Sequence, residues 1–162
     1  MEDKSSKGLK ASELSKISGA RSVAITMKTI QYAEGEKDVT ELFSRGELVR
    51  KSGKFVLSYQ DSEVTGFNGD TIITVADDDV IDVMRSGEYF SHLTLEHGQK
   101  HHYRYESEHG EFMLGVTADE LNSSFLDGEN GCLGSVYARY TLDINSALVS
   151  QNEMYIDFNE IQ

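Results

Sequence analysis

A two-residue alternation of apolar and polar side chains runs through most of this chain, starting at Ser22. Val23, Ile25 and Met27 alternate with smaller or polar residues, which indicates a β-strand with one buried face. Similar short segments follow, separated by turns rich in glycine and aspartate, such as Lys51–Gly53. Short strands at regular spacing, without helical segments between them, are typical of a β-sandwich or a β-barrel.

The order of these segments favours an up-and-down barrel of about eight to ten strands. Strands that follow each other in sequence usually lie side by side, and closing the sheet removes exposed edges that this proline-free chain does little else to protect. The sequence therefore predicts an all-β, antiparallel barrel as a single domain over residues 22–162. Residues 1–21, rich in lysine, serine and glycine, are expected to form a flexible tail.

Charge and cysteine content limit the classes of partner. The chain has 28 acidic and 15 basic residues and a formal net charge of −13. Such a surface repels phosphate backbones, so no nucleic-acid partner is predicted. Polar residues interrupt every apolar stretch, and neither a membrane segment nor a signal peptide is expected. The single cysteine, Cys132, allows no internal disulfide, which favours a cytoplasmic protein.

Strand parity assigns a few polar side chains to the interior. Tyr59 and Asp61 fall on the face that carries Leu57, and Arg85 falls on the apolar face of its own strand. A hairpin with a three-residue loop at 98–100 would pair residues 93–95 with residues 103–105 and turn Tyr103 and Tyr105 inward. The rest of the predicted interior is apolar: Met27, Phe55, Leu57, Ile73, Val75, Leu93, Phe112, Leu114, Val136, Leu142 and Ile156.

These inward-facing polar groups form the candidate site. An arginine in a barrel mouth could hold an anion through its planar fork, with tyrosine hydroxyls fixing the orientation. The predicted ligand-binding residues are Arg85, Tyr59, Tyr103, Tyr105 and Asp61, and the ligand is a small apolar or weakly anionic molecule. The competing interpretation is structural, because charged residues inside barrels more often satisfy each other, and Arg85 would then pair with Asp61 or a backbone carbonyl. The corresponding alternative function is a filled barrel that meets a protein partner through its outer surface.

Nothing in the sequence indicates catalysis, a cofactor or a metal site. The same hairpin would set His97 opposite His101, but the pattern fixes no third ligand beside them. The acidic turns at 77–79 and 127–131 lack the twelve-residue calcium-loop pattern. No nucleophile motif, phosphate-binding glycine loop or dinucleotide fingerprint is present, so a binding role is favoured over an enzyme.

Three segments resemble a known family. Gly53–Tyr59, Val83–Gly87 and Tyr140–Ile144 are similar to segments of the YwiB-like bacterial family, a domain of unknown function, and the resemblance runs from about residue 22 to the C-terminus. It implies a calycin-like, lipocalin-like β-barrel in a bacterial, intracellular protein. It implies no activity and no site residues, although Arg85 lies inside one of the similar segments.

Overall fold

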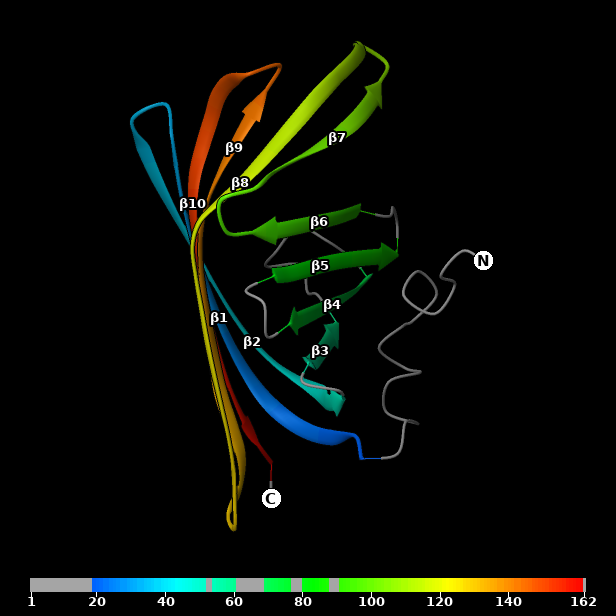
Figure 1. Cartoon of the computed structure of the whole chain (residues 1–162), viewed down its shortest axis with the longest axis vertical. Coiled ribbons are helices and arrows are strands. Elements are labelled where there is room, and N and C mark those ends of the chain that lie inside the picture. Colours follow the sequence, from blue (N-terminus) through cyan, green and yellow to red (C-terminus); the bar gives the residue numbers. More distant parts are fainter. Residues whose placement is uncertain (1–18, 52–53, 61–68, 77–79, 88–90, 162) are drawn as a thin grey trace.

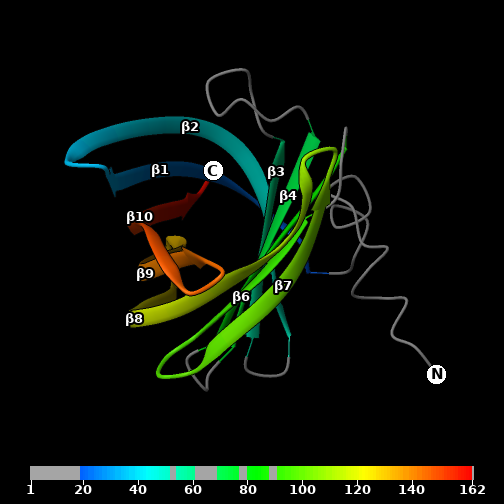
Figure 2. The ribbon, with the colours of Figure 1, turned by 90° about the horizontal axis from the view of Figure 1, so that it is seen from above.

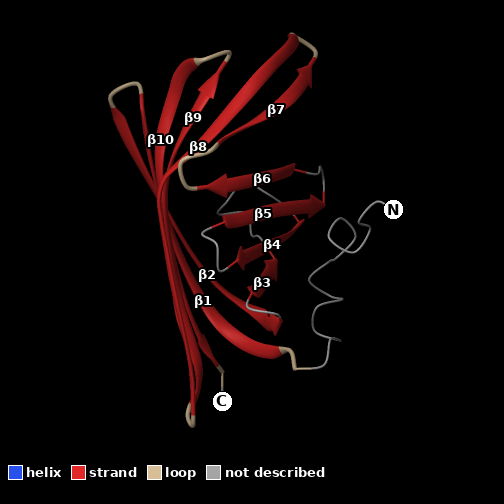
Figure 3. Cartoon of the chain, in the orientation of Figure 1, coloured by secondary structure: helices blue, strands red, loops and turns tan. Residues whose placement is uncertain are grey.

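The computed structural model describes residues 19–51, 54–60, 69–76, 80–87 and 91–161, without the side chains of residues 51, 105 and 107. These residues form only strands and loops (Figure 3), and none of them belongs to a helix that could cross a membrane. The ten strands are β1 (Arg21–Ala33), β2 (Glu36–Lys51), β3 (Lys54–Gln60), β4 (Gly69–Ala76), β5 (Val80–Gly87), β6 (Ser91–Glu96), β7 (Lys100–Ser107), β8 (Gly110–Gly128), β9 (Gly131–Ile144) and β10 (Ala147–Glu160).

The strands form one antiparallel sheet in the order β6-β5-β4-β3-β2-β1-β10-β9-β8-β7. The sheet curls around a shared interior into a nearly closed barrel (Figures 1 and 2). The predicted all-β antiparallel barrel is therefore confirmed. Neighbours in sequence are neighbours in the sheet with one exception, since β6 and β7 lie at the two ends of the strand order. In addition, the first strand, β1, pairs with the last, β10.

Two tight turns show how the sequence sets the hairpins. Glu34 and Gly35, with φ of 53° and 77°, join β1 to β2, and Asn145 and Ser146, with φ of 49° and 70°, join β9 to β10. Positive φ at both central residues gives a turn whose twist matches that of the flanking strands. Both hairpins pair up to the residues that flank these turns, so the turns set the register of β1 against β2 and, up to the irregularity between Leu148 and Ser150, of β9 against β10.

The barrel interior is the hydrophobic core. Alternate residues of β1, starting with Val23, Ile25 and Met27, are buried as predicted. Most of the other predicted interior residues are also buried, while Leu93, Leu114 and Leu142 are partly buried and pack against the core. Phe112 is only partly buried and lies outside this core cluster. The alternation therefore predicted the inner face of the sheet well.

The predicted hairpin between β6 and β7 is wrong. The chain turns one step earlier than predicted, since the Gln99 N–H donates to the Glu96 carbonyl at 3.1 Å, and the Gly98 N–H donates to Ala118 of β8. β7 pairs with β8 along its length and splays away from β6 (Figure 1), so no backbone ladder joins β6 to β7. His97 is accordingly bridged to Ala118 and is not opposite His101.

We call the boundary between β6 and β7 the seam. A side chain takes the place of the missing ladder there, because the Thr94 backbone N–H donates to the Tyr103 hydroxyl. Tyr103 packs against the core and Arg104 is exposed, so the predicted faces of β7 hold although the predicted pairing does not. Parity within a strand is a local property, whereas pairing depends on where neighbouring strands run.

Candidate ligand-binding site

An interior cavity of about 160 Å³ lies between two halves of the barrel. One wall comes from β5 and β6, near one end of the sheet, and the other from β1, β9 and β10. The strands of one wall are not sheet neighbours of the strands of the other wall, so side chains from the two walls meet across the barrel interior. The apolar lining residues are Val83, Leu93, Leu95 and Met154. The cavity is thus a partly open pocket of the barrel interior, and most of the described residues that line it keep some accessible surface.

Arg85 borders this cavity from β5 and belongs to a row of polar residues on the inner face. Its partners in register are Thr71 on β4 and Ser91 on β6, and Thr71 is in turn opposite Tyr59 on β3. Thr71 and Tyr59 are fully buried, whereas Arg85 and Ser91 keep some accessible surface where they line the cavity. Arg85 is not a free charge, since it has a partner of its own. Parity therefore placed Arg85 correctly on the inner face.

Tyr140 of β9 lines the same cavity from the opposite wall. Burial raises the pKa of the Tyr140 phenol, and the positive charge of Arg85 opposes that shift. The phenol therefore stays protonated at neutral pH and keeps an O–H to donate. An arginine and a phenol on opposite walls make the cavity suited to a group that accepts hydrogen bonds and carries negative charge.

The remaining predicted site residues lie elsewhere or outside the described part. The Tyr59 hydroxyl donates to Met27 Sδ at 3.6 Å, and Tyr103 lies at the seam, so neither is among the described residues that line the cavity. Asp61 and the side chain of Tyr105 lie outside the described residues. The structural pairing of Arg85 with Asp61 thus stays a prediction. Sequence reasoning did not nominate Tyr140, Thr29 or Met154, because parity does not tell which strands face each other across a barrel.

A second cluster, on the outer face, gathers tyrosines around one carboxylate. Tyr137 and Tyr155 donate to Glu153 Oε2 at 2.8 and 3.3 Å, and Tyr32 donates to Oε1 at 3.4 Å. The rings of Tyr137 and Tyr155 pack with centroids 4.9 Å apart. Burial and the hydrogen bond to Glu153 raise the pKa of Tyr137 to about 12. Because its oxygens already accept these three hydroxyls, Glu153 ties β1, β9 and β10 together.

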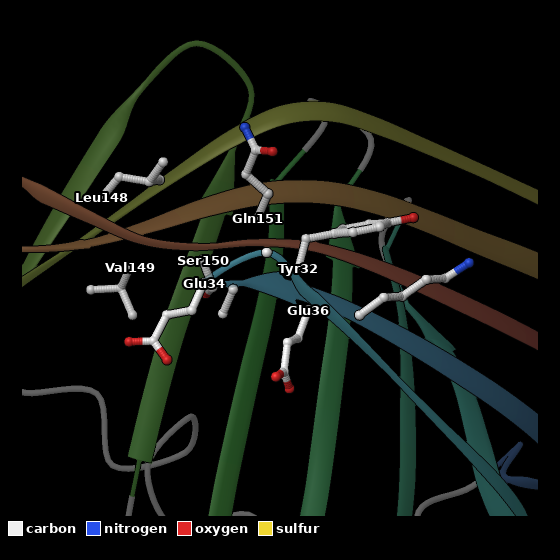
Figure 4. A pocket seen from close by; sticks show the side chains of 10 residues that line it. Tyr32, Glu34, Glu36, Leu148, Val149, Ser150 and Gln151 are labelled. Atoms are coloured by element: carbon white, nitrogen blue, oxygen red, sulfur yellow. The ribbon is translucent and has the colours of Figure 1, made fainter.

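A surface hollow at one end of the barrel does not form a convergent site. It covers about 480 Å³ at the β1–β2 turn and the start of β10. Figure 4 shows its side chains spreading apart, with Gln151 and Glu36 pointing in opposite directions. Leu148 and Val149 beside it are exposed. No charged groups meet there around a common point, so the interior cavity is the better candidate.

Two of the histidines lie within hydrogen-bond distance of acids. His92 Nε2 lies 3.1 Å from Asp82 Oδ1, and His101 Nε2 lies 3.1 Å from Glu96 Oε1. Within the part of the chain that the structure describes, no three histidine, cysteine or acidic side chains come together as metal ligands. Cys132 is buried and unpaired with another cysteine.

The fold and the cavity together define an antiparallel, nearly closed β-barrel with a small interior cavity bordered by one arginine. A family model described as a domain of unknown function (DUF1934) matches residues 25–156, and the chain belongs to this family. A crystal structure of the ywiB protein from Bacillus subtilis is similar in fold, with a TM-score of 0.72 and 22% sequence identity. The match covers 88% of this chain and 94% of that one. No curated protein matches the chain.

Proposed function

We propose that the protein is a binding module that holds a small apolar or weakly anionic molecule inside the barrel, next to Arg85. The observation that carries this proposal is the 160 Å³ interior cavity with an arginine in its lining. A pocket of this size inside a barrel can bury much of the apolar surface of a small molecule, which favours binding. The acidic surface and the single cysteine support a small-molecule role in a reducing compartment such as the cytoplasm.

The volume sets the scale of the ligand. An engineered protein cavity of ~150 Å³ lined by apolar side chains binds benzene. The cavity here is close to that size, and drug-sized ligands commonly need pockets of roughly 300 Å³ or more. A long-chain lipid or a nucleotide would therefore require the barrel to expand.

Native mass spectrometry of the protein purified from its own host tests this function. The expected result is a bound small molecule that is released on denaturation. Leu93→Trp, which fills the cavity, should abolish the adduct, whereas Leu133→Trp on an exposed position of β9 should retain it. Absence of an adduct, together with no shift of the Leu93 and Leu95 methyl NMR signals on adding toluene, would contradict the proposal. That result would favour the alternative, a barrel without ligand whose outer surface meets a protein partner.

A further inference from the structure

The geometry points to a compact monocarboxylate as the class of ligand: one carboxylate held between Arg85 and Tyr140, and an apolar body no larger than a single ring. This inference rests on the proposed function, because it assumes that the cavity is occupied. It is carried by three properties of the cavity, namely its gradient of polarity, its charge and its size.

The register of β5 and β6 divides the cavity wall into a polar and an apolar end. Arg85 is paired with Ser91, and the next inward-facing pair along the strands is Val83 with Leu93. Leu95 follows one step further. This wall therefore has one polar end and is apolar along the rest of four residues of strand, about 13 Å. A molecule that fits such a wall has its polar group at one end only.

The charge of the lining selects the sign of that polar group. Arg85 is the single charged side chain among the described residues that line the cavity, and no carboxylate lines it there. A guanidinium carries five N–H donors in a fork that matches a carboxylate, so one guanidinium can hold more than one hydrogen-bond partner. The protonated phenol of Tyr140 adds a donor from the opposite wall. Two donors from two walls define a place for one anionic group.

Size and overall charge exclude most other anions. A cavity of about 160 Å³ admits a benzene-sized body with little to spare. Phosphorylated metabolites carry two or more negative charges, which a single arginine does not balance, and the net charge of −13 opposes their approach. A singly charged carboxylate satisfies both limits, since its apolar part gains from burial and its charge is paired.

Isothermal titration at neutral pH with three probes tests this class. Benzoate matches the inferred ligand, benzyl alcohol has the same size without the charge, and 2-naphthoate has the charge on a larger body. We expect benzoate to bind about tenfold or more tightly than benzyl alcohol, and 2-naphthoate to bind more weakly than benzoate. Equal or tighter binding of benzyl alcohol would overturn the anionic class while leaving interior binding intact. Binding of none of the probes to a protein that also purifies without an adduct would instead refute the proposed function.

Variants assign the binding to the two walls. Arg85→Met should weaken benzoate about tenfold or more and leave benzyl alcohol nearly unchanged, and Tyr140→Phe should weaken benzoate about fivefold. Arg139→Met, which removes an exposed arginine paired with Glu120, is the control and should change neither. If Arg85→Met does not fold, Arg85→Lys keeps the charge without the fork, and Tyr140→Phe still decides. Undiminished benzoate binding in Tyr140→Phe together with either folded Arg85 variant would overturn the inference.

Discussion

The seam between β6 and β7 is held by the hydrogen bond from the Thr94 N–H to the Tyr103 hydroxyl oxygen. Tyr103→Phe removes this hydroxyl and leaves the rest of the side chain in place. The ring stays to pack against the core, but the Thr94 N–H loses its acceptor. Losing one partner of a partly buried hydrogen bond costs about 1–3 kcal/mol, because the remaining N–H is shielded from water and no longer has an acceptor in the protein. No backbone ladder joins β6 to β7, so we expect this cost to appear first as local opening of β6.

Native-state hydrogen exchange followed by NMR measures that opening directly. A cost of about 1–3 kcal/mol corresponds to roughly 5- to 150-fold faster exchange of the Thr94 amide. Amides in the β1–β10 pairing should change much less, since the central strands open only with the whole barrel. Tyr155→Phe, which removes an outer-face phenol bonded to Glu153, is the matched control and should leave Thr94 unaffected. If Thr94 exchanges at the same rate in Tyr103→Phe as in the wild type, the phenol does not hold the seam.

Three further outcomes follow from single contacts. Ser58 is fully buried and its hydroxyl has no hydrogen-bond partner, so Ser58→Ala should raise the free energy of unfolding by about 1 kcal/mol in urea denaturation. Ser150→Ala is the contrasting variant: it removes the acceptor of the Asn152 side chain and should lower the free energy of unfolding. A Cβ at Gly46 would overlap the Ser58 backbone carbonyl, so Gly46→Ala should destabilise the barrel by roughly 2 kcal/mol or more, and an unchanged thermal midpoint would refute that reasoning. The pKa of Tyr137 is raised from 10 to about 12, so its contribution to stability is complete below pH 10 and is lost as pH rises toward 12. Tyrosinate absorbance should show Glu153→Gln lowering that pKa, and an unchanged titration would mean that burial alone sets it.

The sequence predicted well which residues form strands and which side chains of a strand face inward. It did not predict which distant strands face each other across the barrel. Alternation predicted the inner face of β1 and the inward position of Arg85, because side-chain parity is fixed by the two-residue repeat of each strand. The same parity turns Tyr140 inward, yet its place opposite Arg85 follows from the curl of the whole sheet. The predicted β6–β7 pairing was wrong for a related reason. A short loop between two strands indicates a hairpin, but it does not ensure that the two strands remain side by side beyond the turn. Binding residues that come from distant strands could therefore be identified only from the three-dimensional fold.

The pairing of the first strand with the last has a consequence for how the chain could be rewired. Val23 lies opposite Glu160, and the Ile161 N–H donates to the Ser22 carbonyl at 2.9 Å, so the start of β1 and the end of β10 adjoin in the middle of the sheet. The strand order is consequently that of a simple meander from β6 to β7, except that the chain has its two ends between β1 and β10 in the middle and a loop that joins the outermost strands, β6 and β7. Linking residues near 20 and 161 and opening the chain at Gly98 would restore a meander in which every hydrogen-bonded neighbour is also a neighbour in sequence. Such a circular permutant shortens the longest loop that folding must close, and it should reach the native barrel faster than the natural chain.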